Sequence, residues 1–284
     1  MNIEVTQLTK NYGQKRVLDN INININTGIH GLLGPNGAGK TTFMKILSTL
    51  TPKTSGKVYF DGIDIENKRE IRKIIGYLPQ EFSFYPNFTV YEVLDYFAAL
   101  SNKNYSRREI MDRLEEVHLK DLFKVKTKAL SGGMKRRLGI AVAIIGDPKV
   151  LIVDEPTVGL DPEERIKIRK MLSEIGKEKT VLLSTHIVED IALSCNTLSV
   201  LNRGKIIYNG TVNSMIESAK GYVWNVSTDI HKVEEYSRDF IVVSSILDED
   251  RAMLKIMSKD KPSSNAETTY PSLEDAYMKL MKEL

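Results

Sequence analysis

Hydrophobic and polar residues alternate along the first part of the chain. Ile21, Ile23 and Ile25 are separated by asparagines, which is the period-two pattern of a strand with one buried face. Residues 57–60 then run into Asp61-Gly62, a strong signal for a β-hairpin. The pattern therefore predicts an antiparallel β region near the start of the chain.

The middle of the chain has two other patterns. Residues 150–153 and 181–183 are continuous apolar runs rich in β-branched residues, as expected of parallel strands buried on both faces. Between about residues 85 and 145 the apolar spacing becomes helical. Ser106 and Glu109 form a capping-box pattern there, and a later apolar helix is expected to stop at Asp147-Pro148. Together these patterns predict an α/β fold with a helical insertion.

A third pattern begins after about residue 215. Residues 222–226, 240–246 and 253–257 predict three strands of a small appended α/β unit, and the polar stretch 259–269 predicts a linker. Ser272 and Asp275 predict the cap of a final helix. Its apolar positions form one stripe: Leu273, Ala276, Tyr277, Leu280, Met281 and Leu284. The stripe is expected either to pack on the unit's own strands or to contact a second copy of the chain.

Composition narrows the class of protein. The 284 residues are 42% hydrophobic and 27% charged, values typical of a soluble globular protein of one large or two unequal domains. No run approaches the roughly 20 apolar residues that span a bilayer, and the N-terminus shows no secretory signal. The single cysteine, Cys195, suits the cytoplasm. The net charge of +3 is too small to indicate a nucleic-acid partner.

A glycine-rich loop carries the clearest chemistry. It lies between the apolar run 29–33 and a helix-like segment at 43–47, which is the strand–loop–helix context of a phosphate-binding loop. Its residues are Gly34, Pro35, Asn36, Gly37, Ala38, Gly39, Lys40, Thr41 and Thr42. The glycines let backbone N–H groups converge on phosphate oxygens. Lys40 is expected to reach the β- and γ-phosphates and Thr41 to ligate Mg²⁺, so the loop predicts nucleoside triphosphate binding.

Further motifs follow in a fixed order along the chain. They are Tyr12 in a Lys-Asn-Tyr-Gly segment, Gln80 after Gly-Tyr-Leu-Pro, Leu-Ser-Gly-Gly at 130–133, the strand 150–153 with Asp154 and Glu155, Gly-Leu-Asp at 159–161, and Ser-Thr-His at 184–186. With the phosphate loop, this series resembles the ATP-binding cassette family over roughly residues 1–215. The resemblance implies a P-loop NTPase core with an antiparallel β subdomain and an inserted helical subdomain at about 85–145. A small C-terminal α/β extension would occupy residues 216–284.

The resemblance also implies roles for individual residues. Asp154 would hold Mg²⁺ through water, Glu155 would act as the catalytic base, and His186 would contact the γ-phosphate. Gln80 would contact Mg²⁺ and the attacking water, and Tyr12 would stack on adenine. Ser131, Gly132 and Gly133 would bind the γ-phosphate held by a second subunit. The remaining histidines, His30, His118 and His231, match no motif and are expected to be structural.

Two alternatives stay open around these motifs. An Asp-Glu pair at a strand end is, taken alone, also typical of a solvated turn. The aromatic residues after Gln80 are expected either to contact a membrane partner or to belong to the core of the helical subdomain. They are Phe82, Phe84, Tyr85 and Phe88.

The sequence thus predicts an ATP-hydrolysing subunit, peripheral at the cytoplasmic face of the membrane, that uses ATP and Mg²⁺. Its expected partners are a separately encoded transmembrane permease and a second ATP-binding subunit, in a homodimer or a heterodimer. The continuation at residues 134–137 and the terminal extension resemble subunits that export drugs, peptides or lipid-like substrates. An importer subunit is the alternative, as is a soluble cassette ATPase that acts on ribosomes or DNA. The chain lacks the second cassette, coiled-coil insertions and basic arms typical of the latter.

Overall fold

The computed structural model describes residues 1–101, 103–248 and 250–282. The chain divides into two compact units, Met1–Asn209 and Gly210–Leu284. The sequence predicts this boundary a few residues later, after residue 215. Helix α8 (Val212–Glu217) packs against the terminal helix α10 (Leu273–Lys282), which accounts for the earlier division. No helix among the described residues is both long and apolar enough to cross a membrane.

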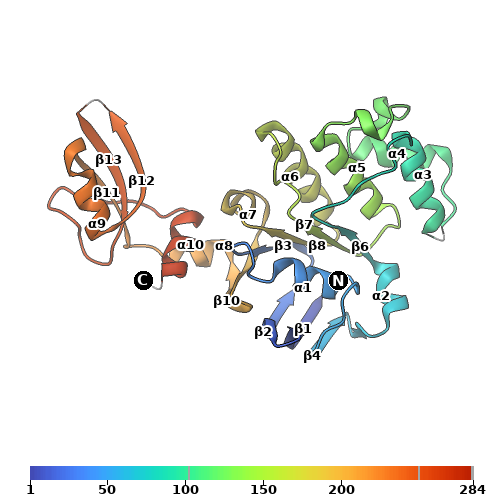
Figure 1. Ribbon diagram of the computed structural model, residues 1–284, viewed down its shortest axis with the longest axis horizontal. Helices are drawn as coiled ribbons and strands as arrows, with labels where there is room; N and C mark the ends of the chain where they lie inside the picture. Colours follow the sequence, from blue (N-terminus) through green and yellow to red (C-terminus); the bar gives the residue numbers. More distant parts are fainter. Residues whose placement is uncertain (102, 249, 283–284) are drawn as a thin grey trace. The chain divides into compact units, whose positions relative to one another are not determined.

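The first unit is built on a six-stranded sheet with the order β10-β9-β3-β8-β7-β6 (Figure 1). Its strands are β3 (Gly28–Leu33), β6 (Ile75–Leu78), β7 (Val150–Asp154), β8 (Thr180–Thr185), β9 (Thr197–Asn202) and β10 (Lys205–Thr211). β3, β6, β7, β8 and β9 pair in parallel. Every residue of β7 and β8 is buried, which confirms the two buried parallel strands that the sequence predicts.

A second sheet of the same unit is antiparallel, with the order β2-β1-β4-β5. Its strands are β1 (Ile3–Tyr12), β2 (Lys15–Ile25), β4 (Ser55–Phe60) and β5 (Ile63–Asp64). Ile21, Ile23 and Ile25 are buried, and Phe60 pairs with Ile63 across the predicted hairpin. The buried faces of both sheets and of α1 (Lys40–Leu47) share one hydrophobic core.

Helices complete the first unit. The helical subdomain contains α3 (Val90–Leu100), α4 (Arg107–Glu116), η1 (Lys120–Leu122), η2 (Thr127–Ala129) and α5 (Gly132–Ile144), grouped together in Figure 1. The remaining helices are α2 (Lys68–Ile74), α6 (Pro162–Gly176) and α7 (Val188–Ser194). Capping boxes at Thr89–Glu92 and Ser106–Glu109 fix the starts of α3 and α4, the second of them as predicted.

The second unit is a four-stranded antiparallel sheet with the order β12-β13-β11-β14. Its strands are β11 (Val223–Asp229), β12 (Ile241–Asp248), β13 (Arg251–Met257) and β14 (Glu267–Thr268), with η3 (Ile230–Lys232) and α9 (Val233–Asp239) between the first two. The three predicted strands are confirmed. The predicted linker at 259–269 is wrong in part, because β14 pairs with β11 through main-chain groups that leave no hydrophobic pattern in the sequence.

The terminal helix α10 uses its apolar stripe within its own unit. Leu273 and Ala276 are buried, and the helix packs mainly against α8 rather than on the strands alone. Asp275 accepts hydrogen bonds from the backbone N–H and hydroxyl of Ser272, which confirms the predicted cap. Its carboxylate also lies 2.5 Å from Lys255 Nζ on β13, so an ion pair ties the helix to the sheet. Leu284, the last predicted stripe position, lies outside the described residues.

His30 is a buried histidine on β3 with a purely local role. Its Nδ1 lies 2.9 Å from Thr197 Oγ1 and its Nε2 lies 3.0 Å from Ser199 Oγ. Burial lowers the pKa of His30 to about 4 from an ordinary value of 6.5. Between these two values the unfolded chain takes up a proton that the folded chain does not. The contribution of neutral His30 to the free energy of unfolding is therefore complete above pH 6.5 and is lost as the pH falls toward 4.

We expect the free energy of unfolding to fall by about 2 kcal/mol more in the wild type than in His30→Gln between pH 7 and pH 5. Urea titrations of both proteins at the two pH values measure this difference. The two proteins share all other titratable groups, so effects of acid elsewhere in the chain cancel in the difference between them. Equal losses in the two proteins would show that His30 is not held neutral by burial.

Candidate functional site

The glycine-rich loop connects β3 to α1. Gly39, the residue before the helix, has a φ of 113°, and a Cβ there would lie 2.8 Å from Leu18 Cδ2. Only glycine fits this backbone and this close approach. The first turn of α1 therefore starts directly from the loop, and the N–H groups of that turn have no partner within the helix. This is the arrangement that binds phosphate at a helix N-terminus.

Lys40 and Glu155 form a buried ion pair in the middle of the site. Lys40 Nζ lies 3.2 Å from Glu155 Oε1, and both side chains are almost fully buried. The ammonium also donates to the carbonyl oxygens of Gly34, at 2.8 Å, and Pro35, at 3.3 Å. The other Glu155 oxygen, Oε2, lies 3.0 Å from His186 Nδ1. One carboxylate thus links the phosphate loop to the histidine after β8.

The backbone explains how Asp154 and Glu155 point in different directions. β7 ends at Asp154, and Glu155 has a φ of 48°, in the left-handed region. Its N–H donates to the Ser184 carbonyl at 3.0 Å, so the turn is held by the neighbouring strand. Strain of this kind at a functional position is commonly retained because it orients a side chain. The pair is therefore not a solvated turn.

Asp154 is fully buried and carries an unused oxygen. Its Oδ1 accepts a hydrogen bond from Ser184 Oγ, whereas its Oδ2 has no hydrogen-bond partner among the described residues. A buried, unpartnered carboxylate oxygen is costly unless a cation or an ordered water meets it. Its negative charge, after the larger effect of burial, raises the pKa of Tyr77 on β6. The donor set therefore fits a Mg²⁺ ion.

These residues surround a cavity of about 660 Å³. Its lining includes Asn36, Gly37, Gly39, Lys40, Thr41, Thr42, Gln80, Glu155 and His186, together with Lys15, Val17 and Val158. The structure thus brings together most of the residues that the sequence proposes, from four separate segments. The lining does not include Gly34, Pro35, Ala38 or Asp154.

Tyr12 is placed differently from the other proposed residues. Its side chain is 48% exposed at the end of β1, and Lys10 Nζ lies 4.7 Å from the centre of its ring. The ring is not part of the cavity wall. Tyr12 pairs with Lys15, which does line the cavity. Stacking of the exposed Tyr12 ring on adenine stays a prediction.

The Leu-Ser-Gly-Gly motif opens α5 at a distance from the phosphate loop. Ser131 caps the helix by accepting from Met134 N–H at 3.2 Å. Gly133 packs closely against α6, since a Cβ there would lie 2.5 Å from Glu164 Oε2. None of the three motif residues lines the cavity that contains Lys40. The N-terminus of α5 is therefore not part of that cavity.

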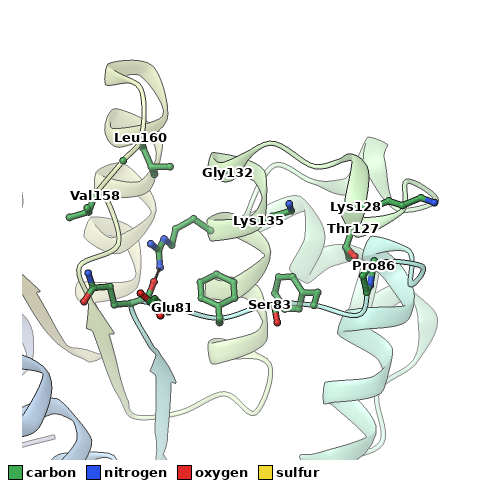
Figure 2. Close-up of a pocket in the computed structure, with 14 residues that line it drawn as sticks. Glu81, Ser83, Pro86, Thr127, Lys128, Gly132, Lys135, Val158 and Leu160 are labelled. Atoms are coloured by element: carbon green, nitrogen blue, oxygen red, sulfur yellow. Dashed lines mark hydrogen bonds between the residues drawn. The ribbon is translucent and has the colours of Figure 1, made fainter.

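A groove of about 650 Å³, shown in Figure 2, adjoins this cavity. Figure 2 shows Val158 and Leu160 at one end and Thr127, Lys128 and Pro86 at the other, with Glu81 and Ser83 between them. Gln80 lines both the groove and the cavity. Val158 also lines both, so the groove and the cavity adjoin at these two residues.

Aromatic and basic side chains shape this groove. Phe82 and Phe84 form an edge-to-face pair with ring centres 5.4 Å apart. Arg136 lies over Phe82, at 5.2 Å from the ring centre, and donates to the Gln80 carbonyl at 2.9 Å. The aromatic residues after Gln80 are half-buried or exposed, with Tyr85 64% exposed. Phe82 packs against Gly139 of α5 and Phe88 against Tyr96 of α3, so these rings lie at the margin of the helical subdomain.

Sequence reasoning missed a buried group behind the site. Asp190 on α7 accepts a hydrogen bond from Thr157 Oγ1, and its Oδ1 lies 3.5 Å from Arg169 Nη1. This links the loop after Glu155 to the helix after His186. The only sequence signal is an acidic residue on an otherwise apolar helical face, which by itself does not identify the partner.

Comparison with known proteins places the chain in a family. The lantibiotic transport ATP-binding protein SrtF of Streptococcus pyogenes is 37% identical over 217 residues, which cover 74% of this chain and 93% of that protein. A family model described as ABC transporter matches residues 18–158. The chain belongs to the ABC transporter family. Within it, the chain is an ATP-binding subunit and an ATPase, as the sequence motifs predict.

Two further likenesses support the assignment to the ABC family. The Nod factor export ATP-binding protein I of Burkholderia orbicola is 37% identical over 224 residues, which cover 77% of this chain and 74% of that protein. A dimeric ATP-binding cassette solved in a post-hydrolysis state with ADP and Pi has a TM-score of 0.66 and 26% identity. That likeness covers 74% of this chain and 98% of the solved one. It confirms the predicted cassette fold.

Proposed function

We propose that this chain is the ATP-hydrolysing subunit of an exporter and works at the cytoplasmic face of the membrane. The observation that carries the proposal is the convergence of Lys40, Glu155 and His186 in one cavity. Two relatives whose names include lantibiotic transport and Nod factor export support an exported substrate over an imported one. A peptide, drug or lipid-like molecule fits this reading.

The hydrolytic step follows from the chain's own groups. The loop amides and Lys40 bind the β- and γ-phosphates of ATP. Glu155 accepts the proton of a water that attacks the γ-phosphorus, and the bond to the ADP oxygen breaks. His186, hydrogen-bonded to Glu155, orients that carboxylate and lines the cavity that would hold the γ-phosphate. Because Glu155 and phosphate compete for the same ammonium, phosphate binding releases Glu155 to act on water.

Thr41, Gln80 and Asp154 are the residues that would hold Mg²⁺. Thr41 and Gln80 line the cavity, and Asp154 presents an unpartnered buried oxygen. When bound, Mg²⁺ would neutralise charge on the phosphates.

A second cassette completes the proposed site. The N-terminus of α5, with Ser131, Gly132 and Gly133, does not line the cavity of its own chain, and its free N–H groups suit an anion held by another subunit. A dimeric cassette structure among the similar proteins supports such pairing. Since this chain carries every motif, two copies would form two equivalent sites.

The groove is the proposed docking surface for a transmembrane permease. Lys128, Lys135 and Arg136 make it basic, whereas Phe82, Phe84 and Leu160 make it partly apolar. This chemistry suits a short amphipathic segment with an acidic face. Because Gln80 belongs to both groove and cavity, a segment seated there is placed to respond to the state of the nucleotide.

We expect Ser83→Trp to prevent co-purification of the membrane subunit while leaving ATP hydrolysis by the isolated chain unchanged. Ser83 is exposed on the floor of the groove, so tryptophan fills the groove without removing a buried contact. Tagged protein is recovered from detergent-solubilised membranes, and polytopic proteins in the eluate are identified and quantified.

Ser55→Trp is the matched control, because Ser55 is exposed on β4, outside the residues that line the groove. Equal recovery of the permease by the two variants would show that the groove is not the docking surface. Recovery of ribosomes or DNA in place of a polytopic protein would contradict the transporter function itself.

A further inference from the structure

β12 is an edge strand of the extension. The sheet order is β12-β13-β11-β14, so β12 pairs on one side only within the described residues. From Ser244 to Asp248 the strand is exposed on both faces. It pairs regularly with β13 over this stretch, from Ser244 opposite Lys255 to Asp248 opposite Arg251. The free side of β12 therefore offers an ordered row of backbone N–H and C=O groups.

This edge is unusually apolar for one that faces water. Ile246 is 69% exposed, Leu247 is 57% exposed and Met253, opposite Ile246 on β13, is 48% exposed. Native edge strands are commonly protected by lysine, proline, inward charges or a covering segment. β12 contains no lysine, arginine or proline, and its one register shift lies before Ser244. The register shift thus lies before the stretch from Ser244 to Asp248, and none of these protective features occurs within that exposed stretch.

The helices of the extension leave the exposed apolar residues of β12 uncovered. α10 packs against α8 and is held to β13 through Lys255 and Asp275. α9 packs against β12 and contributes Val233 and Tyr236 to the core formed with β11, β12 and β13. In the part of the extension that the structure describes, neither helix covers Ile246 or Met253. The apolar stripe of α10, a candidate contact with a second copy, is used locally, and the exposed apolar surface belongs to β12.

We propose that β12 binds β12 of a second copy of this chain, in an antiparallel arrangement that continues the sheet across two extensions. Between Ile241 and Leu247 the strand is uncharged, so two identical strands meet without like charges in register. Parallel pairing would place the two Asp248 carboxylates side by side. Antiparallel pairing separates them by about 20 Å, from the rise per residue of a strand.

A second copy fits this edge better than an unrelated strand for a further reason, which rests on the proposed function. Two cassettes that share ATP bring two extensions to one complex, and so raise the effective concentration of one β12 for the other. The strand pairing needs no nucleotide, whereas the cassette pairing does. The extension would therefore keep two chains together between rounds of hydrolysis.

The test measures self-association of the full chain without nucleotide. We expect sedimentation velocity over a concentration series to show a reversible dimer. Ile246→Lys should raise its dissociation constant by at least about tenfold, because it places two ammonium groups in the apolar contact. Ser237→Lys is the matched control, since Ser237 is exposed on α9 in the same unit and the charge change is equal. It should leave the dissociation constant unchanged.

A cross-link provides a second measurement. Ser245→Cys places one thiol near the middle of β12 on each chain, where antiparallel strands bring the two within reach of a short bifunctional reagent. The natural Cys195 is buried and burial raises its pKa, so it contributes little reaction. Efficient cross-linking without nucleotide, lost on adding Ile246→Lys, supports the pairing.

A wild type that stays monomeric without nucleotide at all concentrations would overturn the β12 proposal, as would an unchanged constant in Ile246→Lys. Failure of the proposed function looks different. The double variant Glu155→Gln, Ile246→Lys can pair only through its cassettes. If it stays monomeric at saturating ATP, the proposed shared ATP site is wrong.

Discussion

Glu155→Gln is expected to reduce ATP turnover to near the background level while ATP binding persists. The amide keeps the size of the carboxylate and its hydrogen bond toward His186, but it is too weak a base to take a proton from water. Glutamine also cannot neutralise Lys40, which lies 3.2 Å from Glu155 Oε1 in the wild type. The variant should therefore bind ATP at least as tightly as the wild type does. Phosphate release and equilibrium ATP binding, measured on the same preparation, test both statements.

The same variant should accumulate a closed dimer in ATP, because binding is retained and the step that reopens the pair is blocked. Light scattering with and without ATP gives the mass directly. Glu178→Gln is the matched control, since Glu178 is exposed near the end of α6 and the chemical change is identical. Turnover that survives in Glu155→Gln would assign the base to another residue. A monomer under saturating ATP would count against the shared site.

The motifs of the cassette could be predicted from the sequence because each depends on a local context. A glycine loop between a strand and a helix, or a carboxylate at the end of a buried strand, is defined by a few neighbouring residues. β7 and β8 end side by side in a parallel sheet, so Glu155 and His186, which follow these two strands, meet at one edge. The fold class followed from the same local patterns.

Contacts between distant segments could not be predicted in this way. The hydrogen bond from Thr157 to Asp190 joins two elements that only the tertiary fold brings together. Likewise, β14 is defined by main-chain pairing with β11 and carries no apolar pattern. The apolar stripe of α10 indicated that the helix is covered, but not that α8 covers it. Periodicity identifies a buried face without identifying its partner.

The ion pair between Lys40 and Glu155 is also a contact between distant segments, and it affects how strongly the chain binds ATP. Lys40→Ala should weaken ATP binding by about 10- to 150-fold, because it removes a charge-assisted contact to phosphate worth about 1.5–3 kcal/mol. It also leaves the buried Glu155 without its cation, close to where the γ-phosphate binds. Repulsion between these two anions adds to the loss, so the effect should lie toward the upper end of that range.

Two comparisons separate these contributions. Lys45→Ala removes an exposed lysine from the same helix α1 and should leave ATP affinity unchanged. Combining Lys40→Ala with Glu155→Gln removes the unpaired carboxylate and should restore part of the lost affinity. Titrations with a fluorescent ATP analogue on the three proteins measure this. Unchanged affinity in Lys40→Ala would show that the loop does not bind the phosphates. Equal affinity in the single and double variants would show that Glu155 and phosphate do not compete for Lys40.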